Sequence, residues 1–160
     1  MIDRIWRTAL AFVPALAVTY LVAVLCFTQF NLATLASMNV PVSTAVRFET
    51  TLQDLGGMTS LYLPIIFIAL ATAFTTARIL LRWMPQWRTA MFVVAGFCAI
   101  LAINYVLGVV ALLMVGEFFV VHPFVVTRSV PGMLSQCAAG ALGGYVFALC
   151  LQPNRSQPQE

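Results

Sequence analysis

The sequence predicts an all-α membrane protein whose four transmembrane helices form one bundle. Its 160 residues are 62% hydrophobic and only 8% charged, whereas soluble proteins average about 25% charged residues. The apolar residues also fall into four runs, each close to the roughly 20 residues that a helix needs to cross a bilayer. Four such spans would occupy most of the chain, so we expect a single membrane domain over residues 1–152.

The first predicted span covers about residues 8–30 and follows Asp3, Arg4 and Arg7. A cleaved signal peptide has a shorter apolar core of about 7–15 residues that ends in a small-residue cleavage site. Here the run reaches spanning length, and no clean Ala-x-Ala site follows it. We therefore expect this segment to be retained as a transmembrane helix.

The three later spans cover about residues 61–82, 89–115 and 134–151. A basic turn with Trp83 and Trp87 follows the second span, as is typical of a membrane interface. The third span ends before Glu117 and the fourth before Pro153. The remaining residues, 153–160, form a polar tail that we place in the cytoplasm.

The arginines are distributed unequally between the two sides of this topology, and the chain has no lysine. The side that holds both termini carries Arg4, Arg7, Arg78, Arg82, Arg88 and Arg155. The other side carries only Arg47 and Arg128. The positive-inside rule then places both termini in the cytoplasm. The absence of lysine and of eukaryotic targeting features points to a bacterial inner membrane, and the scattered charge argues against nucleic-acid binding.

The two outer connections are rich in β-branched and aromatic residues. Residues 40–53 alternate with a period of two, which predicts an extended strand, and residues 118–130 could pair with it as a small β-hairpin over the bundle. A short interfacial helix from about Ser43 to Leu55, stopped by Gly56 and Gly57, is the alternative.

Small residues mark one face of the fourth span as a packing surface. Gly140 and Gly144 form a Gly-x-x-x-Gly pair, which lets another helix backbone approach closely. The predicted face comprises Ala139, Gly140, Gly143, Gly144 and Ala148. It serves either contacts within one bundle or contacts between chains, and the pattern alone leaves both open.

Asn104 lies near the middle of the third span, where an unpaired amide would cost about 1–3 kcal/mol. We therefore expect Asn104 to face protein as part of an intramembrane polar cluster. The candidate members are Thr19, Tyr20, Thr72, Thr75, Thr76, Asn104 and Tyr105. Such a cluster either bonds helices together or lines a substrate or ion path.

The outer connections also hold one group of ionisable residues: Arg47, Glu49, Asp54, Glu117, His122 and Arg128. Ion pairs such as Arg47 with Glu49 or with Glu117 would steady the outer surface. The alternative is that the group binds an anion, with His122 and Glu117 able to move a proton. The four cysteines have no metal-site spacing and the single histidine has no catalytic motif around it, so we expect no metal, cofactor or catalytic residue.

These features favour a small inner-membrane protein that acts in the bilayer by association with other membrane chains. It would be an accessory subunit of a larger complex or a homo-oligomer rather than an enzyme. One alternative is a small transporter or channel with a pathway lined by polar residues of the second and third spans. A further alternative is a lipid- or quinone-linked enzyme that uses Arg47, His122 and Arg128.

Overall fold

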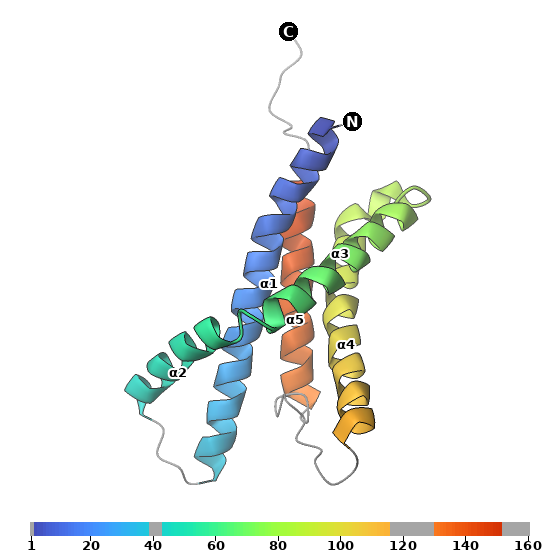
Figure 1. Ribbon diagram of the computed structural model, residues 1–160. Helices are drawn as coiled ribbons and strands as arrows, with labels where there is room; N and C mark the ends of the chain where they lie inside the picture. Colours follow the sequence, from blue (N-terminus) through green and yellow to red (C-terminus); the bar gives the residue numbers. More distant parts are fainter. Residues whose placement is uncertain (1, 39–42, 116–129, 152–160) are drawn as a thin grey trace.

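The computed structural model describes residues 2–38, 43–115 and 130–151, and every regular element within them is a helix. The elements are α1 (Ile2–Ser37), α2 (Thr44–Gly57), α3 (Tyr62–Leu80), a 3-10 turn η1 (Pro85–Trp87), α4 (Arg88–Val115) and α5 (Val130–Cys150). In Figure 1, α5 lies between α1 and α4 and packs against both, while α3 crosses the bundle obliquely toward one end of α4. α2 packs against the half of α1 that lies away from the termini.

Four of these helices are long and apolar enough to cross a membrane. The candidate spans are Trp6–Ser37, Tyr62–Leu80, Pro85–Val106 and Pro131–Cys150. This confirms that the described fold is helical with four helices able to span a membrane, and each of them overlaps the span predicted for it.

The first helix is longer than the predicted span. α1 has 36 residues, or about 54 Å at 1.5 Å per residue, which exceeds the roughly 30 Å of a bilayer core. It continues past Phe30 because leucine and alanine support the helix there, and the Thr34 hydroxyl is accommodated by a bond to the Phe30 carbonyl oxygen (2.9 Å).

The strand prediction for residues 40–53 is wrong, since α2 occupies Thr44–Gly57. Ser43 caps its first turn by accepting a hydrogen bond from the Val46 amide (3.3 Å), and serine is a preferred residue at this position. The short-helix alternative therefore describes this connection. Residues 118–129, the predicted partner strand, lie outside the described residues, as does the tail.

An aromatic core joins α1, α3, α4 and α5 near the end that holds the termini. Phe74 and Phe147 stack with ring centroids 4.4 Å apart, and Phe92 meets Phe147 edge to face at 5.0 Å. Phe12 adds edge contacts from α1 at 6.1 Å and 6.4 Å. Such pairs contribute about 0.5–1.5 kcal/mol each beyond area burial, so this core fixes α3 to the other helices.

Candidate functional site

The predicted small-residue face of α5 packs inside the bundle. All five of its residues are buried: Ala139, Gly140, Gly143, Gly144 and Ala148. A Cβ atom on Gly140 would run into the Gly96 carbonyl oxygen of α4, and one on Gly144 would run into the carbonyl oxygen of Phe92. Gly143 faces α1, where an added Cβ would lie 2.9 Å from the Ala15 carbonyl oxygen. This face therefore serves contacts within the chain, which was one of its two predicted uses.

Sequence reasoning missed the partner of this face, Gly96. A Cβ on Gly96 would meet the carbonyl oxygen of Gly140, so the two backbones touch here. Gly96 has no second glycine four residues away, since the other glycine of α4 is Gly108. A glycine inside an apolar span was the available signal, because it often marks a close backbone approach.

The seven residues of the predicted polar cluster do not converge. Thr19 is fully buried, but its hydroxyl donates within α1 to the Ala15 carbonyl oxygen (2.9 Å). The three α3 threonines are exposed and donate to carbonyl oxygens of their own helix: Thr72 to Ile68 and Ala69, Thr75 to Ala71, and Thr76 to Thr72. Tyr105 is 75% exposed. Within the part of the chain that the structure describes, Tyr20 is the one member that bonds to another helix.

A different polar network links four helices on the side of the bundle away from the termini. The Tyr20 hydroxyl of α1 donates to the Leu55 carbonyl oxygen of α2 (2.7 Å), and Thr28 of α1 donates to Asp54 Oδ2 (2.8 Å). The Tyr62 hydroxyl of α3 donates to Gln136 Oε1 of α5 (3.1 Å). Gln136 Nε2 in turn donates to the Ala23 carbonyl oxygen of α1 (2.9 Å).

Gln136 is the member of this network that the sequence analysis overlooked. Its side chain is only 3% exposed, and a buried amide in a transmembrane helix usually bonds to a neighbouring helix. The signal was visible as a glutamine two residues inside the predicted fourth span. Together the four bonds orient α2 and α3 against α1 and α5.

The predicted group of outer ionisable residues is described only in part. Arg47 donates from Nη1 to Gln29 Oε1 (3.0 Å), so within the described residues the expected pair with Glu49 does not form. Asp54 accepts the Thr28 hydroxyl, and Glu49 is exposed. The other three members, Glu117, His122 and Arg128, lie outside the described residues.

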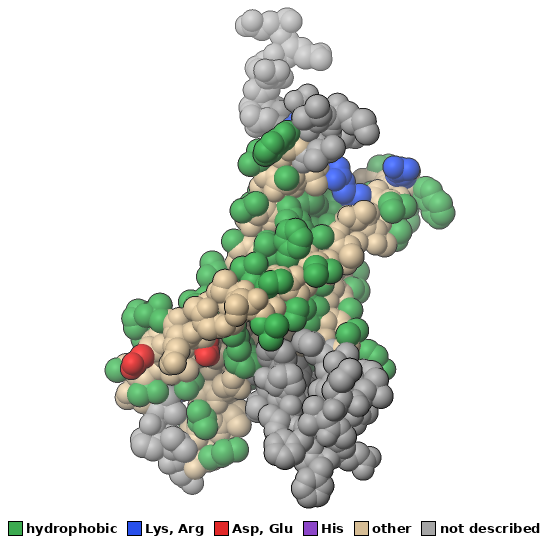
Figure 2. Space-filling model, viewed as in Figure 1, with side chains coloured by type: hydrophobic (Ala, Val, Ile, Leu, Met, Phe, Trp, Pro, Cys, Tyr) green, Lys and Arg blue, Asp and Glu red, His purple; other side chains and the backbone are tan. Residues whose placement is uncertain are grey.

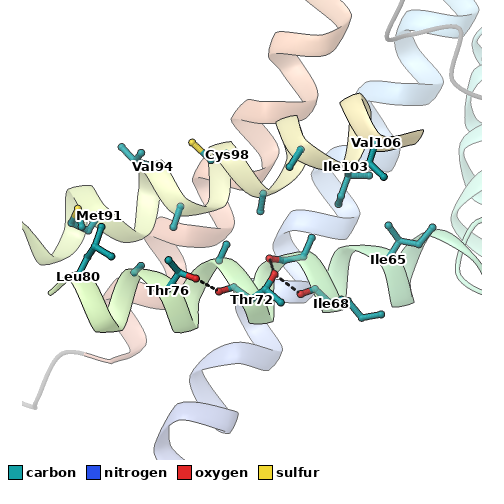
Figure 3. Close-up of a pocket in the computed structure, with 16 residues that line it drawn as sticks. Ile65, Ile68, Thr72, Thr76, Leu80, Met91, Val94, Cys98, Ile103 and Val106 are labelled. Carbon is teal, nitrogen blue, oxygen red and sulfur yellow. Dashed lines mark hydrogen bonds between the residues drawn. The ribbon is translucent and has the colours of Figure 1, made fainter. Parts of the chain in front are cut away.

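An apolar groove of about 730 Å³ lies between α3 and α4 (Figure 3). Thr72 and Thr76 line it, but their hydroxyls are bonded to their own helix, as the dashed lines in Figure 3 show. No charged side chain of the described residues lines this groove. Small residues on both walls leave the hollow open: Ala69, Ala73 and Ala77 on α3, and Ala95, Ala99 and Ala102 on α4.

Within the described residues, no group of three or more histidine, cysteine or acidic side chains could hold a metal ion. Cys26, Cys98, Cys137 and Cys150 are all free thiols.

Asn104 yields a prediction about whether its side-chain amide stabilises the bundle. Its Nδ2 atom is enclosed without a hydrogen-bond partner, so Asn104→Leu should raise the free energy of unfolding by about 1 kcal/mol. Thermal unfolding in mild detergent measures this, with Thr75→Leu as an exposed control that stays near the parent value. A destabilised Asn104→Leu variant would show that the amide has a bonding role.

Protein-family models, curated proteins and solved structures were all compared with this chain, and none of them matches it. A functional conclusion must therefore come from the groove, the charges and the packing of the helices.

Proposed function

We propose that this chain is a small multi-pass protein of a bacterial inner membrane that acts by association with another membrane chain. Its partner is a transmembrane helix, from a second copy or from a larger complex, seated in the groove between α3 and α4. The observation that carries this proposal is the pair of small-residue walls that line an otherwise apolar, uncharged groove.

The spacing of the small residues supports a helix as the occupant. Ala69, Ala73 and Ala77 follow one another at intervals of four along α3, and Ala95 and Ala99 do so along α4. Small residues four apart let helix backbones approach closely, which is how transmembrane helices gain van der Waals contact in the absence of a hydrophobic driving force.

The large exposed fraction of α3 supports the same proposal. Only 22% of the α3 span is buried, against 44% for α5. Its buried positions recur on one face at Ile66, Leu70 and Phe74, which leaves the face toward the groove open to a further helix.

The distribution of charge supports an orientation with both termini in the cytoplasm. Arg7, Arg78, Arg82 and Arg88 line one cavity at the end that holds the start of α1 and the end of α5. The described acidic side chains, Glu49 and Asp54, belong to α2 toward the opposite end (Figure 2). Such a bias is typical of the cytoplasmic side of a membrane protein.

The transporter or channel alternative has weaker geometric support. It needs Thr72, Thr76, Asn104 and Tyr105 to share one pathway, but of these only the two threonines line the groove. The enzyme alternative depends on His122 and Arg128, which lie outside the described residues, so no geometry favours it.

Site-specific photo-crosslinking in native membranes tests the association. A photoreactive residue at Ala102, on the groove wall, should give one defined protein adduct of fixed mass, whereas the same residue at exposed Ala138 of α5 should not. Ala102→Leu should fill the groove and so reduce co-purification of the crosslinked protein at least about tenfold. The matched Ala138→Leu should leave co-purification unchanged. Lipid adducts alone at Ala102, with no protein adduct, would refute the proposal.

A further inference from the structure

A second hollow, of about 540 Å³, opens among arginines at the end of the bundle that holds the termini. Arg7 comes from α1, Arg78 from α3, Arg82 from the turn after it, and Arg88 from the start of α4. Figure 2 shows basic side chains at this end of the bundle. Among the described residues, no carboxylate lines the cavity.

The arginines have donors to offer to a shared anion. Arg78 Nη1 donates to Thr8 Oγ1 (3.0 Å), and Arg88 Nη2 donates to the Leu151 carbonyl oxygen (2.7 Å), which anchors both side chains at the cavity. Each guanidinium carries five N–H donors in a planar fork that matches phosphate oxygens. Arg7 and Arg82 are exposed and can turn toward the same group. An anion would also relieve the repulsion between four like charges.

A third hollow, an apolar crevice of about 630 Å³ between α1 and α3, adjoins the arginine cavity. The two hollows share Thr8 and Arg78 in their walls. From there the crevice runs along the aromatic core, and its walls include Phe12, Phe67 and Phe147. A polar, positively charged cavity therefore leads directly into an apolar channel on the surface.

Tryptophans indicate that the arginine cavity meets the crevice at the level of the lipid headgroups. Trp83 is 88% exposed and Trp87 is 55% exposed in the turn beside the cavity, and Trp6 is exposed one residue before Arg7. Tryptophan side chains concentrate at the membrane interface, and basic pockets between spans on the cytoplasmic side suit anionic lipid heads.

We propose that the cavity and the crevice together bind one anionic phospholipid. Its phosphate accepts hydrogen bonds from the arginines, and one acyl chain lies in the crevice against the phenylalanines. The crevice lies on the opposite side of α3 from the alanine-lined groove: Phe67, Ala71 and Thr75 line the first, and Ala69, Thr72 and Thr76 the second. Lipid binding can therefore succeed or fail independently of the proposed helix partner.

Lipid retention by the full-length chain tests the proposal. The protein in mild detergent is mixed with equal amounts of phosphatidylglycerol and phosphatidylcholine that carry identical acyl chains, and bound lipid is measured by native mass spectrometry. Phosphatidylglycerol should be retained about tenfold more than phosphatidylcholine, because charge-assisted hydrogen bonds strengthen its binding.

Two kinds of variant separate the contributions of the lipid headgroup and of its acyl chain. Arg7→Gln with Arg82→Gln, at exposed positions that leave packing intact, should reduce the preference for phosphatidylglycerol to about twofold or less. Ala71→Leu, or Thr75→Leu as a second choice at an exposed site, should fill the crevice and lower retention of both lipids. Arg47→Gln and exposed Ala17→Leu are the matched controls and should leave retention unchanged.

Three results would overturn the proposal. Equal retention of the two lipids would remove the role of the arginines. An Arg47→Gln variant as impaired as the double variant would indicate net charge rather than a built site. If inorganic phosphate displaces phosphatidylglycerol while both crevice variants retain it fully, the site is for a soluble phosphate compound and not for a lipid.

Discussion

Leucine in place of Gly96 is expected to lower the free energy of unfolding by about 3 kcal/mol, the largest loss we anticipate for a single substitution. The added side chain would begin inside the space held by the Gly140 carbonyl oxygen and close to the Gly144 amide nitrogen (3.3 Å). These atoms are backbone of α5 and cannot move aside as a flexible side chain would. α4 and α5 would have to separate along their whole contact.

The chain contains a control glycine for this experiment. Gly56 lies inside α2, and a Cβ atom built on it has no neighbour within 4 Å. Gly56→Ala should therefore stabilise the protein by about 0.5–1 kcal/mol, because alanine loses less backbone entropy than glycine in a helix. Thermal unfolding in mild detergent, followed by circular dichroism, compares both variants with the parent. A Gly96→Leu variant that melts with the parent would contradict the close α4–α5 contact.

The spans were predictable because hydrophobic length is a strong and local signal. A run of about 20 apolar residues has few stable alternatives to a transmembrane helix, and each predicted span overlaps an observed helix. The alternation over residues 40–53 was a weaker signal. The cap from Ser43 and the bond between Thr28 and Asp54 favour the helix, and the second of these depends on a tertiary contact that periodicity cannot reveal.

The candidate site was predictable only where one helix carried the whole signal. The spacing of the glycine pair in α5 indicated a close contact. The identity of its partner, Gly96, could not be predicted because it depends on how α4 and α5 align. Depth in the membrane suggested that Thr72 and Thr76 join Asn104, yet threonine hydroxyls can bond to their own helix, and these do. Likewise, the arginine cavity is lined by side chains from α1, α3 and α4. These helices are far apart in the sequence, so the cavity could not be predicted from it.

Removal of the Gln136 amide should produce the second large effect. Gln136→Leu would delete bonds to both Tyr62 and the Ala23 carbonyl oxygen, and it would place an apolar group beside the Tyr62 hydroxyl. We expect the free energy of unfolding to fall by about 2 kcal/mol, since buried polar groups that lose a partner cost about 1–3 kcal/mol. Gln53→Leu, at an exposed position of α2, changes the same atoms without burial and should stay near the parent value.

A double-mutant cycle with Tyr62→Phe isolates the bond between α3 and α5. If the Tyr62 hydroxyl acts through Gln136, the double variant should be less destabilised than the sum of the single variants, by about 0.6–1.7 kcal/mol. Unfolding free energies from detergent titration give all four corners of the cycle. Strict additivity would show that the Tyr62 hydroxyl and Gln136 do not stabilise the bundle through each other, which would leave the stacked pair of Phe74 and Phe147 as a contact that ties α3 to α5.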